Sequence, residues 1–103
     1  MRVVGIGGPG GQAVAQMAMA GLAGVDFVVV DTDRQRLTNT AVPTRIHYDP
    51  RALAGSARMT HALYTALQGA DMLILIADLP GHDDALRTLL ALGRTAGAVV
   101  VAL

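Results

Sequence analysis

A cluster of glycines near the start of this sequence has the residue types best suited to a chemical task. The apolar residues Val3, Val4 and Ile6 are followed at once by glycines, and a helical pattern starts at Ala13. Unpaired backbone amides at a helix N-terminus bind anions, and glycine lets a phosphate approach the backbone closely. We therefore expect a phosphate site built from Gly7, Gly8, Gly10 and Gly11.

The glycine spacing fits more than one role. Gly5, Gly7 and Gly10 satisfy the G-x-G-x-x-G pattern of dinucleotide-binding folds, which is a weak signal when it stands alone. The same residues would also serve an ordinary tight turn between a strand and a helix. Other residues must decide whether a nucleotide binds and which one.

Two acids follow the second apolar run, Phe27–Val30. Asp31 lies 21 positions after Gly10, close to the offset at which an acid binds an adenosine ribose in dinucleotide folds. This spacing gives one alternative, an NAD domain of the potassium-channel regulatory type. The other is that Asp31 and Asp33 end a strand and cap the next short helix.

A third group of acids surrounds Gly81 and His82, and consists of Asp78, Asp83 and Asp84. Carboxylates suit Mg²⁺, which could bridge them to a bound phosphate, so these acids are candidate metal ligands. Acids are also selected at the start of any helix, where they interact favourably with the helix dipole. We favour the helix-start interpretation.

The composition limits the class of protein. The chain has 103 residues, of which 52% are apolar and 3% aromatic, with no cysteine and a formal net charge of zero. This is the size of one domain, residues 1–103. The missing cysteines exclude disulfides and thiolate zinc sites, and the lack of a basic stripe argues against a nucleic-acid partner. No segment approaches the ~20 apolar residues of a membrane span, and we expect a cytoplasmic location.

Elements that could position these residues follow from the hydrophobic pattern. Apolar runs alternate with segments of helical period, as in parallel βαβ units. The expected strands are residues 3–6, 27–30, 44–48, 72–77 and 98–103. Helices are expected from Ala13, after Asp33, from Ser56 and near Asp83, with glycines 24, 69 and 97 ending three of them. The predicted fold is α/β, a three-layer Rossmann-like parallel sheet of about five strands in the order 3-2-1-4-5 with about four helices.

The whole chain resembles one family, the N-terminal nucleotide-binding half of FtsZ, the bacterial tubulin homologue. The resemblance is carried by Val4 to Gly8, Gly10 to Val14, Gly21 to Phe27, Thr32-Asp33 with Gln35 and Leu37, Ala66 to Met72, and Ala98 to Val101. It implies that the first glycine loop holds phosphates and that residues after the second strand lie near the nucleotide. The implied nucleotide contacts are Gly7, Gly8, Gly10, Gly11, Gln12, Asp31, Asp33, Gly55 and Gly81.

The sequence also departs from the family pattern. Gln12 and Asp31 stand where the family has asparagines, and its ribose-side glutamate aligns with Ala91. The third glycine loop is shortened to Gly55-Ser56. The signature Gly-Gly-Gly-Thr-Gly-Thr-Gly is replaced by residues 78–84.

These departures predict a partly dismantled nucleotide site. Carboxylates repel phosphate, and a proline such as Pro9 or Pro80 lacks an amide donor. Losing two or three hydrogen bonds to a charged group would weaken binding by roughly 10²- to 10⁵-fold.

The functional hypothesis is therefore a non-catalytic FtsZ-like module, with no catalytic residue assigned. It would bind GTP or GDP weakly, with Mg²⁺ only alongside nucleotide, or act as an assembly module. Because the family's GTPase loop and C-terminal domain are not found here, hydrolysis by this chain alone is not expected. The alternatives are an NAD or adenine-nucleotide sensor, and a fragment of a larger active FtsZ-type GTPase. The apolar edge strand 98–103 predicts a homo-oligomer or an FtsZ-like partner.

Overall fold

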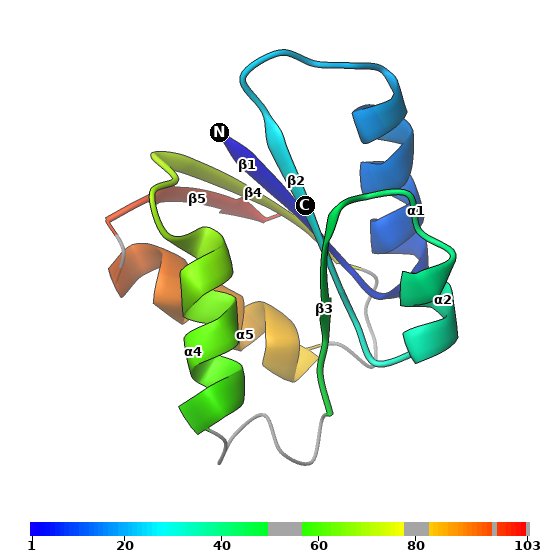
Figure 1. Cartoon of the computed structure of the whole chain (residues 1–103). Helices are drawn as coiled ribbons and strands as arrows, with labels where there is room; N and C mark the ends of the chain where they lie inside the picture. The colour runs from blue at the N-terminus through cyan, green and yellow to red at the C-terminus, as the bar shows by residue number, and fades with distance from the viewer. Residues whose placement is uncertain (50–56, 78–82, 96, 103) are drawn as a thin grey trace.

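The protein forms a five-stranded parallel sheet with helices on both faces (Figure 1), as a computed structural model describes it for residues 1–49, 57–77, 83–95 and 97–102. In chain order the elements are β1 (Arg2–Ile6), α1 (Gly7–Met19), β2 (Asp26–Asp31), α2 (Arg34–Thr38), β3 (Thr44–His47), α4 (Ala57–Leu67), β4 (Met72–Ala77), α5 (Asp83–Thr95) and β5 (Val99–Ala102). The strand order is β3-β2-β1-β4-β5. The predicted fold class and strand order are confirmed.

β1 is the central strand and sets the register of the sheet. Val4 pairs with Val28 of β2 on one side and with Leu75 of β4 on the other. These strands are continuous apolar runs because helices cover both of their faces. β3 and β5 form the two edges, as the sequence predicted.

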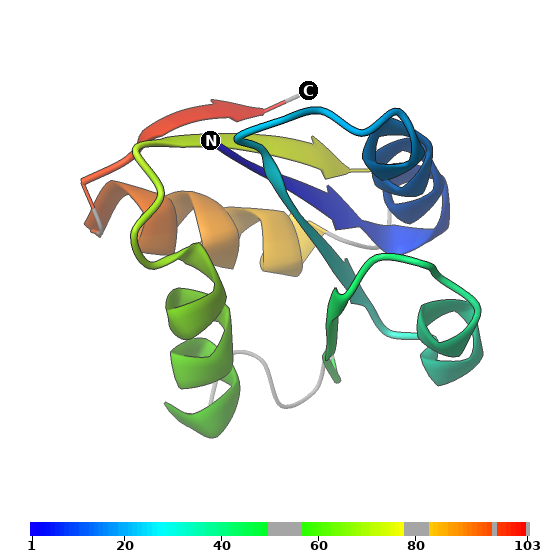
Figure 2. The same ribbon diagram turned by 45° about the horizontal axis from the view of Figure 1, so that its top comes forward.

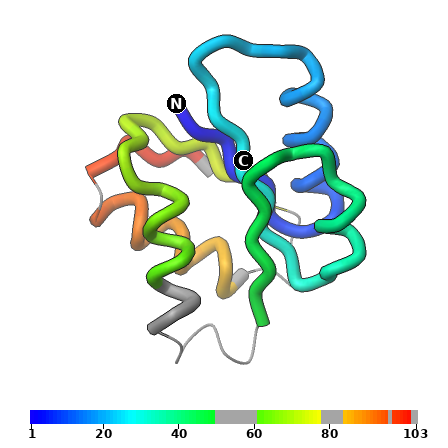
Figure 3. The backbone as a smooth tube through the Cα atoms, in the orientation of Figure 1, coloured from blue at the N-terminus to red at the C-terminus, as the bar shows by residue number. Residues whose placement is uncertain are grey.

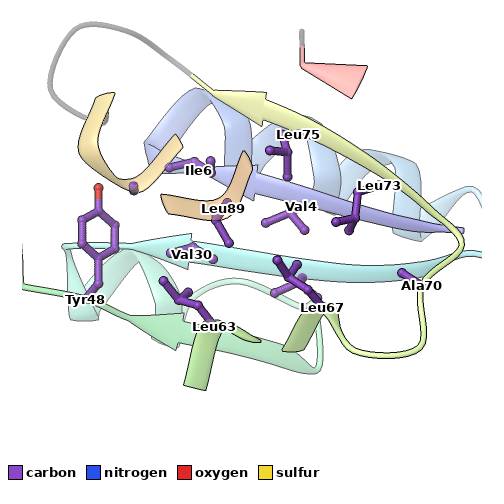
Figure 4. Packing of buried hydrophobic residues seen from close by; sticks show 12 residues of the cluster. Val4, Ile6, Val30, Tyr48, Leu63, Leu67, Ala70, Leu73, Leu75 and Leu89 are labelled. Carbon is purple, nitrogen blue, oxygen red and sulfur yellow. The ribbon is translucent and has the colours of Figure 1, made fainter. Parts of the chain in front are cut away.

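The two faces of the sheet carry separate cores. α4 and α5 cover one face, where Leu63, Leu67 and Leu89 point toward Val4 and Val30 (Figure 4). α1 and α2 cover the other face, where a smaller cluster gathers: Val3, Val14, Val29, Leu37 and Val42. Figure 2 shows the sheet between these two layers of helices. Side chains of Ala, Val, Leu and Ile make up most of both cores, and the buried Tyr48 is an aromatic member of the larger one.

Helix α1 differs from the prediction at both ends. It begins at Gly7 rather than Ala13, so the glycines form its first turns instead of a loop before it. It ends at Met19 and not near Gly24, because Gly21 takes a left-handed φ of 70° directly after the last turn. The helix starts early because α1 packs closely on β1 and β4. A Cβ on Gly5 would collide with the Gly10 carbonyl, and one on Gly10 with the Ile76 carbonyl.

Side chains from the start of the chain hold the end of α4. Arg2 donates from Nη1 to the carbonyl oxygens of Ala66 at 2.7 Å and Gln68 at 2.8 Å. The Met1 ammonium lies 3.3 Å from the Asp71 carboxylate. The two bonds from Arg2 satisfy carbonyls at and just beyond the C-terminus of the helix, and the Met1–Asp71 contact pairs two charges. Among the described residues there is no helix long and apolar enough to cross a membrane.

Candidate functional site

The glycine turn joins the carboxyl end of β1 directly to α1. Gly7 has a φ of 81°, a left-handed conformation that glycine adopts without strain. The residue before the helix is Ile6, whose side chain cannot cap the first amides, and the first turn holds no acid. The residue at the N-cap position therefore leaves the first amides of α1 uncapped. Pro9, in the same turn, supplies no amide.

The glycines of this turn divide into two roles. Gly10 and Gly11 are buried and face β4 and β2, so they permit close packing of the helix. Gly8 is only half-buried, and a Cβ there would lie 3.6 Å from Nε of Arg36. Gly8 is therefore the glycine whose backbone a ligand could reach, and Arg36 stands beside it.

Asp31 lies at the end of β2 with its side chain only 2% exposed, and it is bound by Arg36. Nε of Arg36 donates to Oδ2 at 2.8 Å and Nη2 donates to Oδ1 at 2.9 Å. The Asp33 amide adds a third hydrogen bond to Oδ1 at 3.2 Å. Burial on its own would raise the pKa of Asp31, but these hydrogen bonds and the charge of Arg36 together lower that pKa below its ordinary value. The carboxylate stays ionised and engaged.

Asp33 caps α2. Its Oδ1 accepts the amides of Gln35 at 2.9 Å and Arg36 at 3.1 Å, and Oδ2 lies 3.6 Å from Nη1 of Arg36. This is the capping role that the sequence offered as one of two interpretations of these acids.

A cavity of about 340 Å³ lies between α1 and the segment from α2 to Ala41. Five of the predicted nucleotide contacts line it: Gly7, Gly8, Gly11, Gln12 and Asp31. Arg36 lines it too, with its guanidinium half exposed. Gly10 and Asp33 do not line this cavity. Such a volume lies at the low end of small-molecule sites.

The remaining predicted residues are only partly placed. Gly55, Asp78 and Gly81 lie outside the described residues. Asp83 begins α5 and Asp84 is exposed on its first turn.

Burial, with the charges of Asp31 and Asp84, raises the pKa of Tyr48 to about 12. Within the described part of the chain no three acids or histidines come together as a metal site.

Sequence reasoning missed Arg36, which is the cation of this site. A usable signal was present, because Arg36 follows Asp33 by three positions and such pairs meet on one face of a helix. Its bond to Asp31 could not be inferred in the same way, since it crosses from a helix to the end of a strand.

Two FtsZ proteins are similar to this chain in sequence. No family model matches the chain. The chain is 33% identical over 93 residues to the cell division protein FtsZ of Mycoplasmopsis pulmonis, a match that covers 79% of this chain and 24% of the relative. It is 63% identical over 38 residues to cell division protein FtsZ 1 of Rhizobium meliloti, which covers 37% of this chain and 6% of the relative.

Solved FtsZ structures from M. jannaschii match nearly the whole fold. A mutant of that FtsZ superimposes with a TM-score of 0.82 and 24% identity, over 98% of this chain and 36% of the other. An empty FtsZ dimer gives a TM-score of 0.80 and 23% identity, over 98% and 34%. The chain belongs to the FtsZ/tubulin superfamily. It corresponds to the N-terminal Rossmann-like part of FtsZ and spans about a quarter of the M. pulmonis relative.

The resemblance implies that this FtsZ-like chain differs from its family at the cavity itself. The neutral asparagine that the resemblance places at position 31 is replaced by a buried carboxylate, and that charge is matched by Arg36. The uncapped amides of α1 still face the same space as Gln12. A phosphate reaching Gly8 would therefore meet a guanidinium already bound to Asp31, and would have to share it.

Proposed function

We propose that this FtsZ-like domain is a weak guanine-nucleotide-binding or assembly module that does not hydrolyse GTP on its own. The observation that carries this proposal is the Arg36–Asp31 pair, whose buried carboxylate lies at the edge of the cavity beside Gly8. The α1 amides and Arg36 favour a phosphate, whereas the Asp31 charge repels it. The two effects oppose each other, so the site retains affinity without being tight.

The cellular setting of this proposal comes from the relatives. Both are named cell division proteins, and one solved structure is named a dimer. We place this chain in the cytoplasm, in cell division, with a second copy or an FtsZ-like chain as its partner. The exposed valines of β5, Val99 and Val101, would form the contact.

Calorimetric titration with GTP, GDP, ATP and NAD, each with and without Mg²⁺, tests the nucleotide part. We expect GTP and GDP to bind more weakly than micromolar and no phosphate to be released. Submicromolar GTP binding together with turnover by this chain would contradict the proposal.

An NAD or adenine-nucleotide sensor is the second candidate, because Asp31 stands at the end of β2 where a ribose-binding acid is expected. Its carboxylate already accepts three hydrogen bonds, which leaves less capacity for a ribose. Asp31→Ala would lower NAD affinity if a ribose binds there, whereas under the first proposal it would raise GTP affinity by removing the charge that repels phosphate. Asp31→Asn is the matched control, since it keeps an acceptor.

A third possibility is that the chain acts as one part of a larger FtsZ-type GTPase. The match covers 24% of the M. pulmonis relative and 36% of the mutant M. jannaschii structure, which supports this interpretation. Reconstitution with the remaining portion of an FtsZ chain would then produce GTP turnover that neither part has alone.

A further inference from the structure

A second cavity lies between α2 and the edge strand β3, on another face of α2 from Arg36. Its volume is about 320 Å³, and it is lined by Arg34, Leu37, Thr38, Arg45 and His47. It shares no lining residue with the cavity at the glycine turn. Figure 3 follows the chain from α2 through the connecting loop into β3, the two elements that form its walls.

Residue spacing explains why these side chains converge. Arg45 and His47 are two positions apart on a strand and so share one face of the sheet, while Ile46 between them packs into the opposite core. Arg34, Leu37 and Thr38 follow the i, i+3, i+4 spacing that places residues on one side of a helix. Leu37 is 7% exposed and supplies an apolar floor.

The polar groups of this cavity retain donors that protein contacts do not use. Within the described part of the chain the guanidinium of Arg34 makes no hydrogen bond or ion pair, and only its backbone carbonyl accepts from the Thr38 hydroxyl. Among the described residues Arg45 uses only Nη1, which donates to the carbonyls of Leu37 at 3.1 Å, Thr40 at 3.3 Å and Thr38 at 3.5 Å, so Nε and Nη2 remain. Nε2 of His47 donates to the Thr32 carbonyl at 3.0 Å, so this donor is already used and the free donors of the cavity are those of the two arginines.

Charge in the cavity is one-sided. Two guanidinium groups line it, and none of the lining residues is acidic. Asp33, which caps α2, is engaged by two backbone amides and Arg36. An anion would therefore find donors without a competing carboxylate.

We propose that this cavity binds the phosphate group of a small phosphate monoester. Guanidinium forks match the spacing of phosphate oxygens and form paired hydrogen bonds with them. The volume suits a small ligand. The apolar floor at Leu37 would contact the organic part of the ester.

The test is titration of the whole chain with inorganic phosphate at constant ionic strength, followed by amide shifts in ¹H–¹⁵N spectra. We expect saturable shifts in residues 34–38 and 45–47. Arg34→Gln should weaken the affinity by about tenfold, because it removes charge-assisted hydrogen bonds. Arg45→Lys keeps the charge but loses the fork, and should weaken it less.

The control is Arg87→Gln, which removes an exposed arginine of α5 that has no partner among the described residues. It should leave phosphate affinity unchanged, and thermal unfolding should verify that each variant is folded. Equal weakening by Arg87→Gln, equal affinity for acetate, or shifts confined to residues 7–12 would each overturn the proposal.

Discussion

Arg36 donates hydrogen bonds to both carboxylate oxygens of Asp31 at the end of β2, from Nε to Oδ2 at 2.8 Å and from Nη2 to Oδ1 at 2.9 Å. The carboxylate is almost fully buried, whereas the guanidinium is half exposed and faces a cavity. The pair thus joins a structural role at the strand end to a charge that a ligand can reach.

Removal of Arg36 should destabilise the fold by more than a typical exposed arginine would. Arg36→Ala leaves the buried Asp31 carboxylate without its main partner, at a cost of about 1–3 kcal/mol. Urea unfolding measures this loss. Asp31→Asn in the same chain should recover part of it, and strictly additive effects would show that the two residues are not coupled.

Stability should fall in acid, partly through Asp31. Burial opposes its ionisation, but Arg36 and the Asp33 amide more than compensate, so its folded pKa lies below the ordinary 3.8. A depressed folded pKa stabilises the native state above the unfolded value, and this contribution is lost as the pH falls through the folded pKa. The free energy of unfolding measured from pH 6 to pH 2 should therefore fall below about pH 4.

The matched variant for this acid effect is Asp31→Asn, which should show a shallower fall over the same range. Asp71, whose pKa the Met1 ammonium lowers, remains in both proteins and contributes equally. Identical slopes for the two proteins would rule out a role for Asp31.

Glycines 8 and 10 should respond oppositely to alanine. Gly10→Ala places a methyl group against the Ile76 carbonyl, and overpacking of this kind costs about 1–3 kcal/mol. Gly8→Ala has room beside Arg36 and should be neutral or stabilising by up to about 1 kcal/mol. Thermal unfolding compares them, and a larger loss for Gly8→Ala would contradict the packing described for α1.

If β5 mediates self-association, charges on its exposed valines should weaken it. Val99 is 61% exposed and Val101 is 41% exposed, so lysine at both positions removes apolar surface and adds repulsion between copies. Sedimentation at rising concentration should show a smaller mass for the double variant than for the parent chain. Met19→Lys, at a side chain 82% exposed on α1, is the control and should not change the mass.

The sequence predicted the framework well because the framework depends on local pattern. Apolar runs located four strands, and the weaker, charged segment 44–48 was predicted as the remaining one; the edge positions of β3 and β5 agree with the predicted strand order. The predicted start of α1 was wrong. Glycine is a poor helix former, and the close packing of α1 on β1 and β4 is what places Gly7 to Gly11 inside the helix.

The site was predicted less completely, for a physical reason. Gly8 was identified from the glycine cluster, Gln12 from the family resemblance and Asp31 from its offset after Gly10, and all three line one cavity. The partnership of Asp31 with Arg36, and the meeting of Arg34 with Arg45 and His47, depend on how α2 folds back on the sheet. No spacing rule carries that information.

The bond from Arg2 to the Ala66 carbonyl spans 64 residues and has a consequence for how the protein is made. On the ribosome, β1 emerges well before β4 and α4, so its second edge stays open until they arrive. Stalled or truncated synthesis would leave the middle of the sheet available to other chains, and such products should be the aggregation-prone species in a cell.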